Sequence, residues 1–201
     1  MKLYTHPLST YARRVTMAAL EKGIELETVV VDMAAREHRG EAYKKLNPYG
    51  RVPTLVDGDL VLYESTAILE YLEDRFPSPP LVPEDAADRA RTRMHMKLCD
   101  LQLTPQTSTI IFPKRFIPKD RWRLDAMEKA KQEIEAHLAI LDRELEGKTW
   151  LVAERFTLAE LAYAPFLDFL GLMEIAPPPN VGSWAARMLA RPSAQATKPP
   201  L

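Results

Sequence analysis

Three adjacent hydroxyl side chains, Ser9, Thr10 and Tyr11, stand in the stretch THPLSTYARRV, between a short apolar run and an amphipathic segment. A strand before them and a helix after them would place these hydroxyls at the N-terminus of the helix. A helix N-terminus presents backbone amides without helical partners and a partial positive charge, so an anion is favoured there. Arg13, one turn later, would add positive charge or form a salt bridge to the second domain, and the residues leave both open.

The first 76 residues alternate between strand and helix patterns. A helix over residues 10–23 lies between two strands, and the β-branched run of the second strand is typical of a buried strand. The hairpin is expected around the turn DGD. The expected strands are residues 2–5, 25–31, 52–56 and 60–63, and the expected helices are residues 10–23, 36–46 and 65–76.

The second half of the chain is predicted to be helical throughout. PSPPLVP, residues 77–83, holds four prolines and is the expected linker. We therefore expect an α/β domain at residues 1–76 and an all-helical domain at residues 84–201, whose tail ATKPPL offers nothing to bury. Helical spacing, interrupted at prolines that include Pro113, covers residues 84–112, 120–146, 157–173 and 182–190.

One helix start in this half has an explicit capping pattern. In FTLAEL, Thr157 can cap a helix while Glu160 reaches back to it, and Phe156 can pack on Leu161 as a hydrophobic staple. This pattern predicts a role in stabilising the helix and no catalytic role.

Composition narrows the classes of function. Lys and Arg number 27 against 28 Asp and Glu, so nucleic acid is a poor candidate for a partner. No apolar run reaches the roughly 18 residues of a membrane span, no signal peptide pattern opens the chain, and we expect a cytoplasmic protein. Cys99, the single cysteine, is expected to be buried, and the four histidines lack the spacing of metal ligands.

Several stretches carry a resemblance to a known family: HPLSTYARRV, EHRGEAYKKLNPYGRVPTLVDGD, YESTAILEYLEDRF, FTLAE and WAARMLARPS. They resemble the cytosolic glutathione S-transferases, the phi class most and the theta class next. The resemblance covers nearly the whole chain. It implies a thioredoxin-like βαβαββα domain followed by an all-helical domain, and it places the catalytic serine at Ser9, with Thr10 and Tyr11 as the competing hydroxyls.

Ser9 would act by stabilising the thiolate of glutathione. Lowering a thiol pKa of about 8.5 by two units takes roughly 2.7 kcal/mol. One hydrogen bond to a charged group contributes about 1.5 to 3 kcal/mol and a helix terminus about 0.3 to 1 kcal/mol, so no general base is required. The alternative is that Ser9 only caps its helix.

The resemblance also implies how glutathione is held at two of its three residues. Glu64 and Ser65 open a helix and would bind the γ-glutamyl end, although an ordinary N-terminal cap with an acidic residue explains the same pair. Pro53 is expected to follow a cis peptide bond. The backbone of Val52 would then pair with the cysteinyl part of the tripeptide like an added strand.

His38 and Arg39 match the position where phi enzymes hold the glycyl carboxylate. Taken alone, REHRGE is typical of a solvated charged loop. Arg51 departs from the family, because many relatives carry Gln before the VP pair, and its role stays open.

The second substrate is expected to be a small apolar electrophile, bound between Ser9 and the start of the second domain. Most candidates for its pocket could equally be core residues. These candidates are Leu8, Tyr11, Met33, Ile111, Phe112 and Phe116. Tyr49, in NPYG, matches an aromatic that related homodimers insert into the partner subunit; the alternative is that it packs within its own subunit.

The resulting hypothesis is a homodimeric detoxifying glutathione transferase that uses glutathione as a co-substrate and needs no further cofactor or metal. A glutathione-dependent peroxidase or dehalogenase would use the same site. A third possibility is a non-catalytic binding protein of this fold, like the transferase-like parts of translation and stringent-starvation factors, because fold alone does not decide activity.

Overall fold

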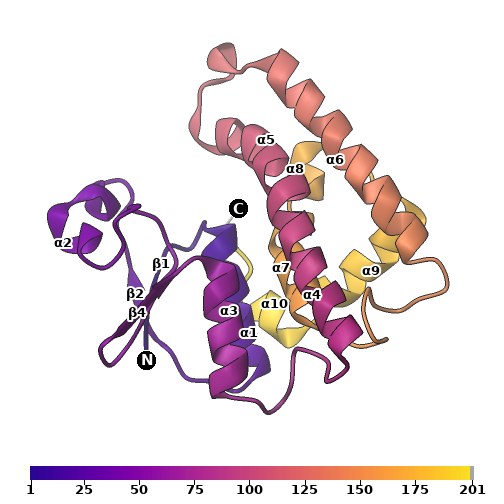
Figure 1. Cartoon of the computed structure of the whole chain (residues 1–201). Helices are drawn as coiled ribbons and strands as arrows, with labels where there is room; N and C mark the ends of the chain where they lie inside the picture. The colour runs from indigo at the N-terminus through magenta and orange to yellow at the C-terminus, as the bar shows by residue number, and fades with distance from the viewer. Residues whose placement is uncertain (200–201) are drawn as a thin grey trace. The chain divides into compact units, whose positions relative to one another are not determined.

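The computed structural model of the chain describes residues 1–199 and separates them into two compact units (Figure 1). The N-terminal unit comprises Met1–Leu81 together with the segment that begins at Pro192, and the helical unit is Val82–Arg191. The structure thus differs from the expected boundaries at the C-terminal end, where the last segment returns to the N-terminal unit.

The N-terminal unit is built on a four-stranded mixed sheet of order β2-β1-β3-β4. β2 runs parallel to β1, whereas β3 is antiparallel to both β1 and β4. The strands are β1 (Lys2–Thr5), β2 (Glu27–Val30), β3 (Thr54–Asp57) and β4 (Leu60–Tyr63). This is the predicted thioredoxin-like arrangement.

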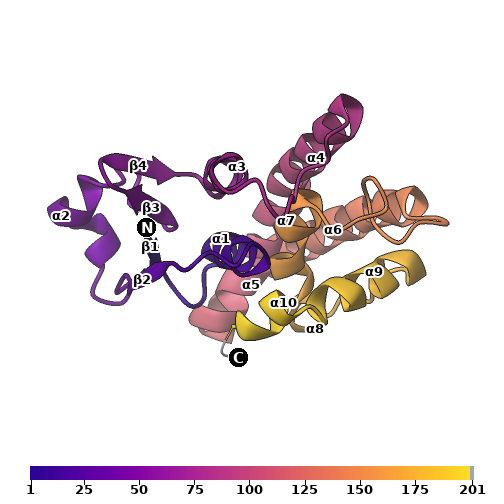
Figure 2. The same cartoon turned by 90° about the horizontal axis from the view of Figure 1, so that it is seen from below.

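The helices of this unit lie on both sides of the sheet (Figure 2). α1 and α3 pack together on one side, and the short α2 lies on the other. The core forms between the sheet and the helix pair, where apolar side chains from β1, β3, α1 and α3 meet. The helices are α1 (Thr10–Glu21), η1 (Glu37–Arg39), α2 (Glu41–Lys44), α3 (Ser65–Arg75) and α10 (Pro192–Ala196), and the core residues are Leu3, Val15, Leu55, Ile68 and Leu72.

Two predictions for this unit are wrong in detail. β2 is an edge strand and three of its four residues are exposed, because only β1 pairs with it; Val30 is 57% exposed, whereas Val31 just beyond it is buried. The polar helix expected at residues 36–46 is broken into η1 and α2, since Gly40 between them has an extended backbone.

The tail ATKPPL, residues 196–201, was expected to offer nothing to bury, whereas Pro199 is buried; residues 200 and 201 lie outside the described residues. The segment before it also packs on the N-terminal unit. α10 packs on α1, with Ser193 and Ala194 buried, and the Ser193 hydroxyl donates a hydrogen bond to Glu21 on α1.

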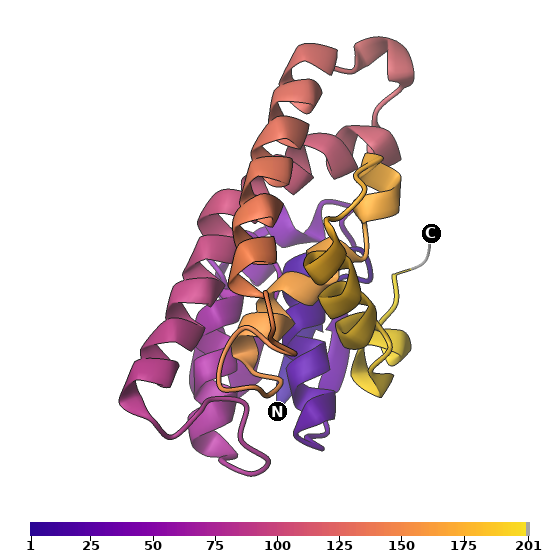
Figure 3. The same cartoon turned by 90° about the vertical axis from the view of Figure 1, so that its right-hand side faces the viewer.

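The helical unit contains α4 to α9, with the long α6 (orange) crossing it in Figure 3. α5 packs along α6, and it continues through Pro113 to Phe116, where the sequence suggested a break. Cys99 is buried as predicted, and its thiol donates to the carbonyl of Ala162. The elements are α4 (Ala86–Leu98), the π-helical η2 (Cys99–Leu103), α5 (Thr104–Phe116), η3 (Lys119–Arg121), α6 (Leu124–Glu144), α7 (Leu158–Leu167), α8 (Leu170–Met173) and α9 (Pro179–Leu189).

α7 forms the centre of the helical unit, because all ten of its residues are buried. The predicted capping box is present at its start. The Thr157 side chain accepts from the backbone amide of Ala159 at 3.1 Å, and the Glu160 carboxylate accepts from the amide of Thr157 at 2.9 Å. Within residues 1–199, no helix combines the length and apolar character needed to cross a membrane.

Candidate functional site

The candidate residues of the N-terminal unit gather at one end of its sheet because of strand register. Thr5 at the end of β1 pairs with Val30 at the end of β2. Tyr4 pairs with Thr54 at the start of β3, and Thr54 in turn pairs with Tyr63 at the end of β4. The segments between β1 and α1, between β2 and η1, before β3, and between β4 and α3 therefore all lie at the same end of the strands. Ser9, the His38 turn, the Val52–Pro53 pair and Glu64 lie in these four segments.

Ser9 is the N-cap of α1. Its backbone is extended, with φ −84° and ψ 111°, and its Oγ accepts a hydrogen bond from the amide of Ala12 at 3.1 Å. Among residues 1–199 the Ser9 hydroxyl proton has no acceptor. Ser9 therefore both caps the helix and keeps a donor for a bound group.

Thr10 and Tyr11, the competing hydroxyls, lie within the first turn of α1. Thr10 is half-buried, and the Tyr11 ring is 37% exposed with the guanidinium of Arg14 at 5.2 Å from its centroid. Neither side chain caps the helix, so Ser9 is the hydroxyl that the backbone orients at this end.

A buried polar network holds the segment before Pro53. The carbonyl of Arg51 accepts hydrogen bonds from the Tyr43 hydroxyl and from the Asn47 amide, both at 2.8 Å. Tyr43 and Asn47 also contact the Thr54 hydroxyl at 2.9 and 3.2 Å. The Val52–Pro53 peptide is cis, as the resemblance implies. Sequence analysis missed Tyr43, Asn47 and Thr54.

The same segment supports the His38 turn. Gly50 has φ +59°, and a Cβ at this position would lie 2.6 Å from the carbonyl oxygen of His38, so only glycine permits this approach. His38 is half-buried, and its Nδ1 is a buried atom that has no hydrogen-bond partner among the described residues. Arg39 beside it is exposed.

Burial and the positive charges of Arg39 and Arg36 lower the pKa of His38, with a smaller effect from His6. The imidazole is therefore favoured in its neutral form. A bound carboxylate would oppose that shift, because a negative charge nearby stabilises the protonated ring.

Glu64 and Ser65 lie at the start of α3, as expected. Glu64 is exposed and has a positive φ of 74°, a strained conformation for a residue with a side chain that costs about 1–3 kcal/mol. Ser65 is buried, and its hydroxyl accepts from Nη1 of the fully buried Arg14 at 3.4 Å. Arg14 was not singled out in the sequence, although it connects α1 to the start of α3.

Arg13 binds the C-terminal segment of its own unit. Its guanidinium donates to the carbonyl of Ala194 at 3.0 Å and to the Thr197 hydroxyl at 3.2 Å. Both partners lie within the expected second domain, residues 84–201, but in the segment that the structure assigns to the N-terminal unit. The other alternative, positive charge beside Ser9, stays a prediction.

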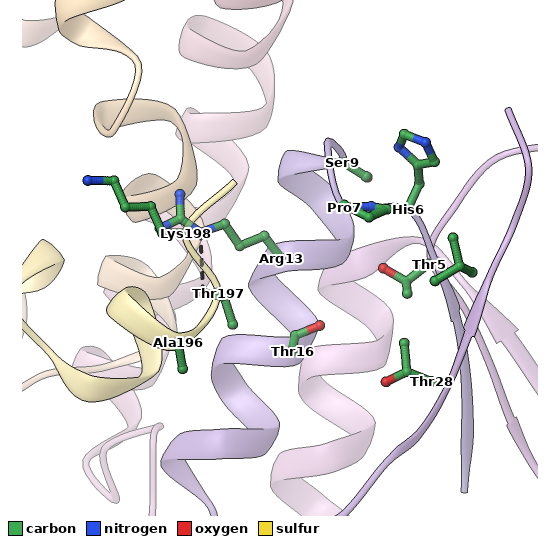
Figure 4. A pocket seen from close by; sticks show the side chains of 11 residues that line it. Thr5, His6, Pro7, Ser9, Arg13, Thr16, Thr28, Ala196, Thr197 and Lys198 are labelled. Carbon is green, nitrogen blue, oxygen red and sulfur yellow. Dashed lines mark hydrogen bonds between the residues drawn. The ribbon is translucent and has the colours of Figure 1, made fainter. Parts of the chain in front are cut away.

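Ser9 also lines a pocket of about 250 Å³ in the N-terminal unit (Figure 4). The pocket lies among the end of β1, the edge strand β2, α1 and the C-terminal segment. Its lining was not predicted, because the sequence does not show that the tail folds back here. The lining residues are Thr5, His6, Pro7, Ser9, Arg13, Thr16, Thr28, Val30, Ala196, Thr197 and Lys198.

The six residues expected to form an apolar pocket are divided between the two units. Leu8, Tyr11 and Met33 belong to the N-terminal unit, whereas Ile111, Phe112 and Phe116 lie on α5 of the helical unit. None of them lines the pocket beside Ser9. A common apolar pocket stays a prediction.

Tyr49 is 68% exposed, which agrees with an aromatic on a loop tip. Its ring also contacts the ring of Tyr63 edge to face, with centroids 5.7 Å apart, so part of it packs within its own unit. Its insertion into a partner subunit stays a prediction.

Comparison with known proteins yields matches to two family models and to related chains. The model described as "Glutathione S-transferase, N-terminal domain" matches residues 8–75, and the corresponding C-terminal domain model matches residues 105–192. The chain is 35% identical to the Stringent starvation protein A homolog of Coxiella burnetii (strain RSA 493 / Nine Mile phase I) over 180 residues, 90% of this chain and 80% of that protein. It is 32% identical to Glutathione S-transferase 3 of Zea mays, over 98% of this chain and 92% of that protein.

Among solved structures, glutathione transferase F2 from Populus trichocarpa is similar, with a TM-score of 0.89 and 26% sequence identity. The match covers 98% of this chain and 96% of that chain.

Proposed function

The chain belongs to the glutathione S-transferase family, and from this premise we propose that it is a serine-type glutathione transferase. The observation that carries the proposal is the state of Ser9, which caps α1 while its hydroxyl proton has no acceptor among residues 1–199. A glutathione thiolate at the N-terminus of α1 would receive that hydrogen bond.

Two features of Ser9 suit this role. Its oxygen already accepts from the amide of Ala12, and a hydroxyl that accepts one hydrogen bond is polarised toward donating another. The helix N-terminus adds a partial positive charge at the same place. The thiolate would attack the electrophile directly, and holding both reactants together would supply much of the remaining acceleration.

The other candidate residues would bind glutathione by its three parts. The hydrogen bonds that the Arg51 carbonyl accepts from Tyr43 and Asn47 would hold the backbone of Val52 in place for the cysteinyl residue. Glu64 and Ser65, with Arg14 behind them, suit the charged γ-glutamyl end. The His38 Nδ1 atom, which has no hydrogen-bond partner within residues 1–199, would bind the glycyl carboxylate, and Arg39 would add its charge.

The test compares Ser9→Ala with Thr10→Ala and with Ser183→Ala, an exposed serine on α9 as the control. Ser9→Ala should lower kcat/KM for conjugation of a chloronitrobenzene at least tenfold, which corresponds to about 1.4 kcal/mol of transition-state stabilisation. Calorimetry should find glutathione affinity within a few fold, and the thiolate absorbance of bound glutathione should disappear below pH 8. Full activity in Ser9→Ala with loss in Thr10→Ala would reassign the catalytic hydroxyl.

A non-catalytic binding protein is the second candidate, and it is favoured by the similarity to a protein named stringent starvation protein A homolog. Glutathione-agarose followed by the conjugation assay separates the two candidates. Retention on the resin with turnover supports the transferase. Retention without turnover supports a binding protein, and the absence of both removes glutathione from the proposal.

A further inference from the structure

The lining of the pocket beside Ser9 combines apolar side chains with several hydroxyl groups, which the expected apolar electrophile does not explain. Alternate strand residues face the same side of a sheet, so Thr5 shares the face of the core residue Leu3. Thr28 pairs with Leu3 across the strands and lies on that same face. The face that α1 covers is thus apolar beneath Val15 and becomes lined with hydroxyls toward the edge strand.

The threonine hydroxyls of the pocket have hydrogen-bonding capacity to spare. Figure 4 shows the oxygens of Thr5, Thr16 and Thr28 facing the space between α1 and the strands. Thr16 donates to the carbonyl of Ala12 at 3.2 Å. Within residues 1–199, the hydroxyls of Thr5 and Thr28 take part in no hydrogen bond. A ligand with several acceptor oxygens would use these donors.

The charge of the lining selects among such ligands. None of the eleven lining residues is acidic, while Arg13, Lys198 and His6 are basic. Arg13 is buried, with 6% of its surface exposed, and Lys198 is exposed, with its side chain extending away from the three threonines in Figure 4. Hydroxyl donors with cationic groups and without carboxylates favour an anion over a neutral polar molecule.

The volume of the pocket gives a scale for the molecule that would fill it. A pocket of about 250 Å³ corresponds to roughly eight water molecules at about 30 Å³ each. One wall, Ala196 to Lys198, is held in place because Arg13 hydrogen-bonds to Ala194 and Thr197. A molecule of up to about eight non-hydrogen atoms would fill this volume.

We propose that this pocket binds small organic carboxylates and that the electrophile of the enzyme carries such a group. The inference rests on the proposed function only in its second part, because Ser9 lines the pocket and the thiolate is assigned to Ser9. With an α-halocarboxylate, the thiolate sulfur forms a bond to the α-carbon, and the carbon–halogen bond breaks. Its electron pair leaves with the halide, and the proton of the glutathione thiol is released to solvent.

The first experiment measures binding without glutathione, so that it does not depend on catalysis. Propionate and its neutral analogue propionamide are titrated into the full chain and followed by NMR of the threonine methyl groups. Saturable shifts of Thr5 and Thr28 with propionate, at least fivefold tighter than with propionamide, support the pocket. Equal affinity for both, or no shift with either, overturns it.

Variants locate the binding. Thr28→Val removes a hydroxyl from a strand without changing its shape much, and Thr109→Val on α5, where the exposed hydroxyl donates to the carbonyl of Pro105, is the matched control. Thr28→Val should weaken propionate binding at least fivefold, and Thr109→Val should leave it within twofold. Equal effects of the two variants would overturn the assignment.

The second experiment adds glutathione and compares chloroacetate with chloroacetamide, which have the same size and leaving group but differ in charge. The enzymatic rate divided by the uncatalysed rate should be at least tenfold higher for chloroacetate, and Thr28→Val should abolish that preference. Propionate binding without any preference in turnover would overturn the substrate assignment. If chloroacetate, chloroacetamide and a chloronitrobenzene are all left unconjugated, the proposed transferase function is wrong. The propionate titration still decides whether the pocket binds carboxylates.

Discussion

Two helix caps, one in each unit, show how the same local motif can have different uses. Thr157 caps α7 in the helical unit and is fully buried, and its hydroxyl donates to Glu160 at 2.7 Å while accepting from Ala159. Ser9 caps α1 and accepts from Ala12, but it lines a pocket and its proton has no acceptor among residues 1–199. A capping hydroxyl whose proton is used by the protein stabilises the fold, and one whose proton is not used can serve a ligand.

The largest expected effect is the loss of stability when the α7 capping box of Thr157 and Glu160 is removed. Glu160 is 0% exposed and accepts from the amides of Leu151 and Thr157 and from the Thr157 hydroxyl. Glu160→Ala leaves three donors without an acceptor, each worth about 1–3 kcal/mol, so the free energy of unfolding should fall by roughly 3 kcal/mol or more. Urea denaturation measures this, with the exposed Glu128→Ala on α6 as the control. A loss below about 1 kcal/mol would mean that this cap is not a folding device.

The contrast between the caps was partly visible in the sequence. FTLAE shows both halves of the capping box within four residues, so the role of Thr157 could be predicted locally. Ser9 required the family resemblance, because a lone serine before a helix is usually only a cap. The environment that distinguishes the two comes from residues far along the chain, including Thr28 and Thr197.

Other features were not predictable for the same reason. The exposure of β2 follows from the order of the strands, and the network around the Arg51 carbonyl depends on where Tyr43 is placed by α2. The fold of the tail depends on Arg13, whose partners lie more than 180 residues away in sequence. Local patterns therefore predicted the element order, and tertiary contacts decided exposure, networks and the pocket.

The next effect concerns a buried polar pair that depends on pH. His137 on α6 contacts the Tyr163 hydroxyl of α7 at 3.2 Å, and burial, with a smaller effect of His95, lowers the pKa of His137 to about 4. Because this value is below the ordinary 6.5, the unfolded chain binds more protons between pH 6.5 and 4. Stability should therefore fall as pH falls through that window, by at most about 3.5 kcal/mol, because the pKa differs by about 2.5 units at roughly 1.4 kcal/mol per unit.

Chemical denaturation at several pH values, compared with His137→Gln, isolates the effect. Carboxylates titrate in both proteins, so the difference between the two pH profiles reports His137. The difference should grow as pH falls from 6.5 to 4 and stay constant above 7. Parallel profiles would show that the helical unit does not hold this ring in its neutral form.

The smallest effects are expected when serine replaces threonine, or threonine replaces serine, at the two N-cap positions. Ser9→Thr and Thr157→Ser both keep a hydroxyl on Cβ, so each helix keeps its cap and Ser9→Thr keeps its donor. Turnover in Ser9→Thr should stay within about threefold of wild type, a change of roughly 0.7 kcal/mol at 1.4 kcal/mol per tenfold. Stability in Thr157→Ser should fall by about 0.5–1.5 kcal/mol, because one buried methyl group is lost.

The alanine variants separate the two caps. Thr157→Ala should lower stability further, by about 1–2 kcal/mol for the lost cap in addition to the methyl group, and leave kcat/KM per folded molecule unchanged. Two outcomes would contradict this difference between the caps: a Thr157→Ala protein with normal stability and reduced turnover, or a Ser9→Thr protein as inactive as Ser9→Ala. Either would mean that the hydrogen bond made by the capping hydroxyl proton does not distinguish Thr157 from Ser9.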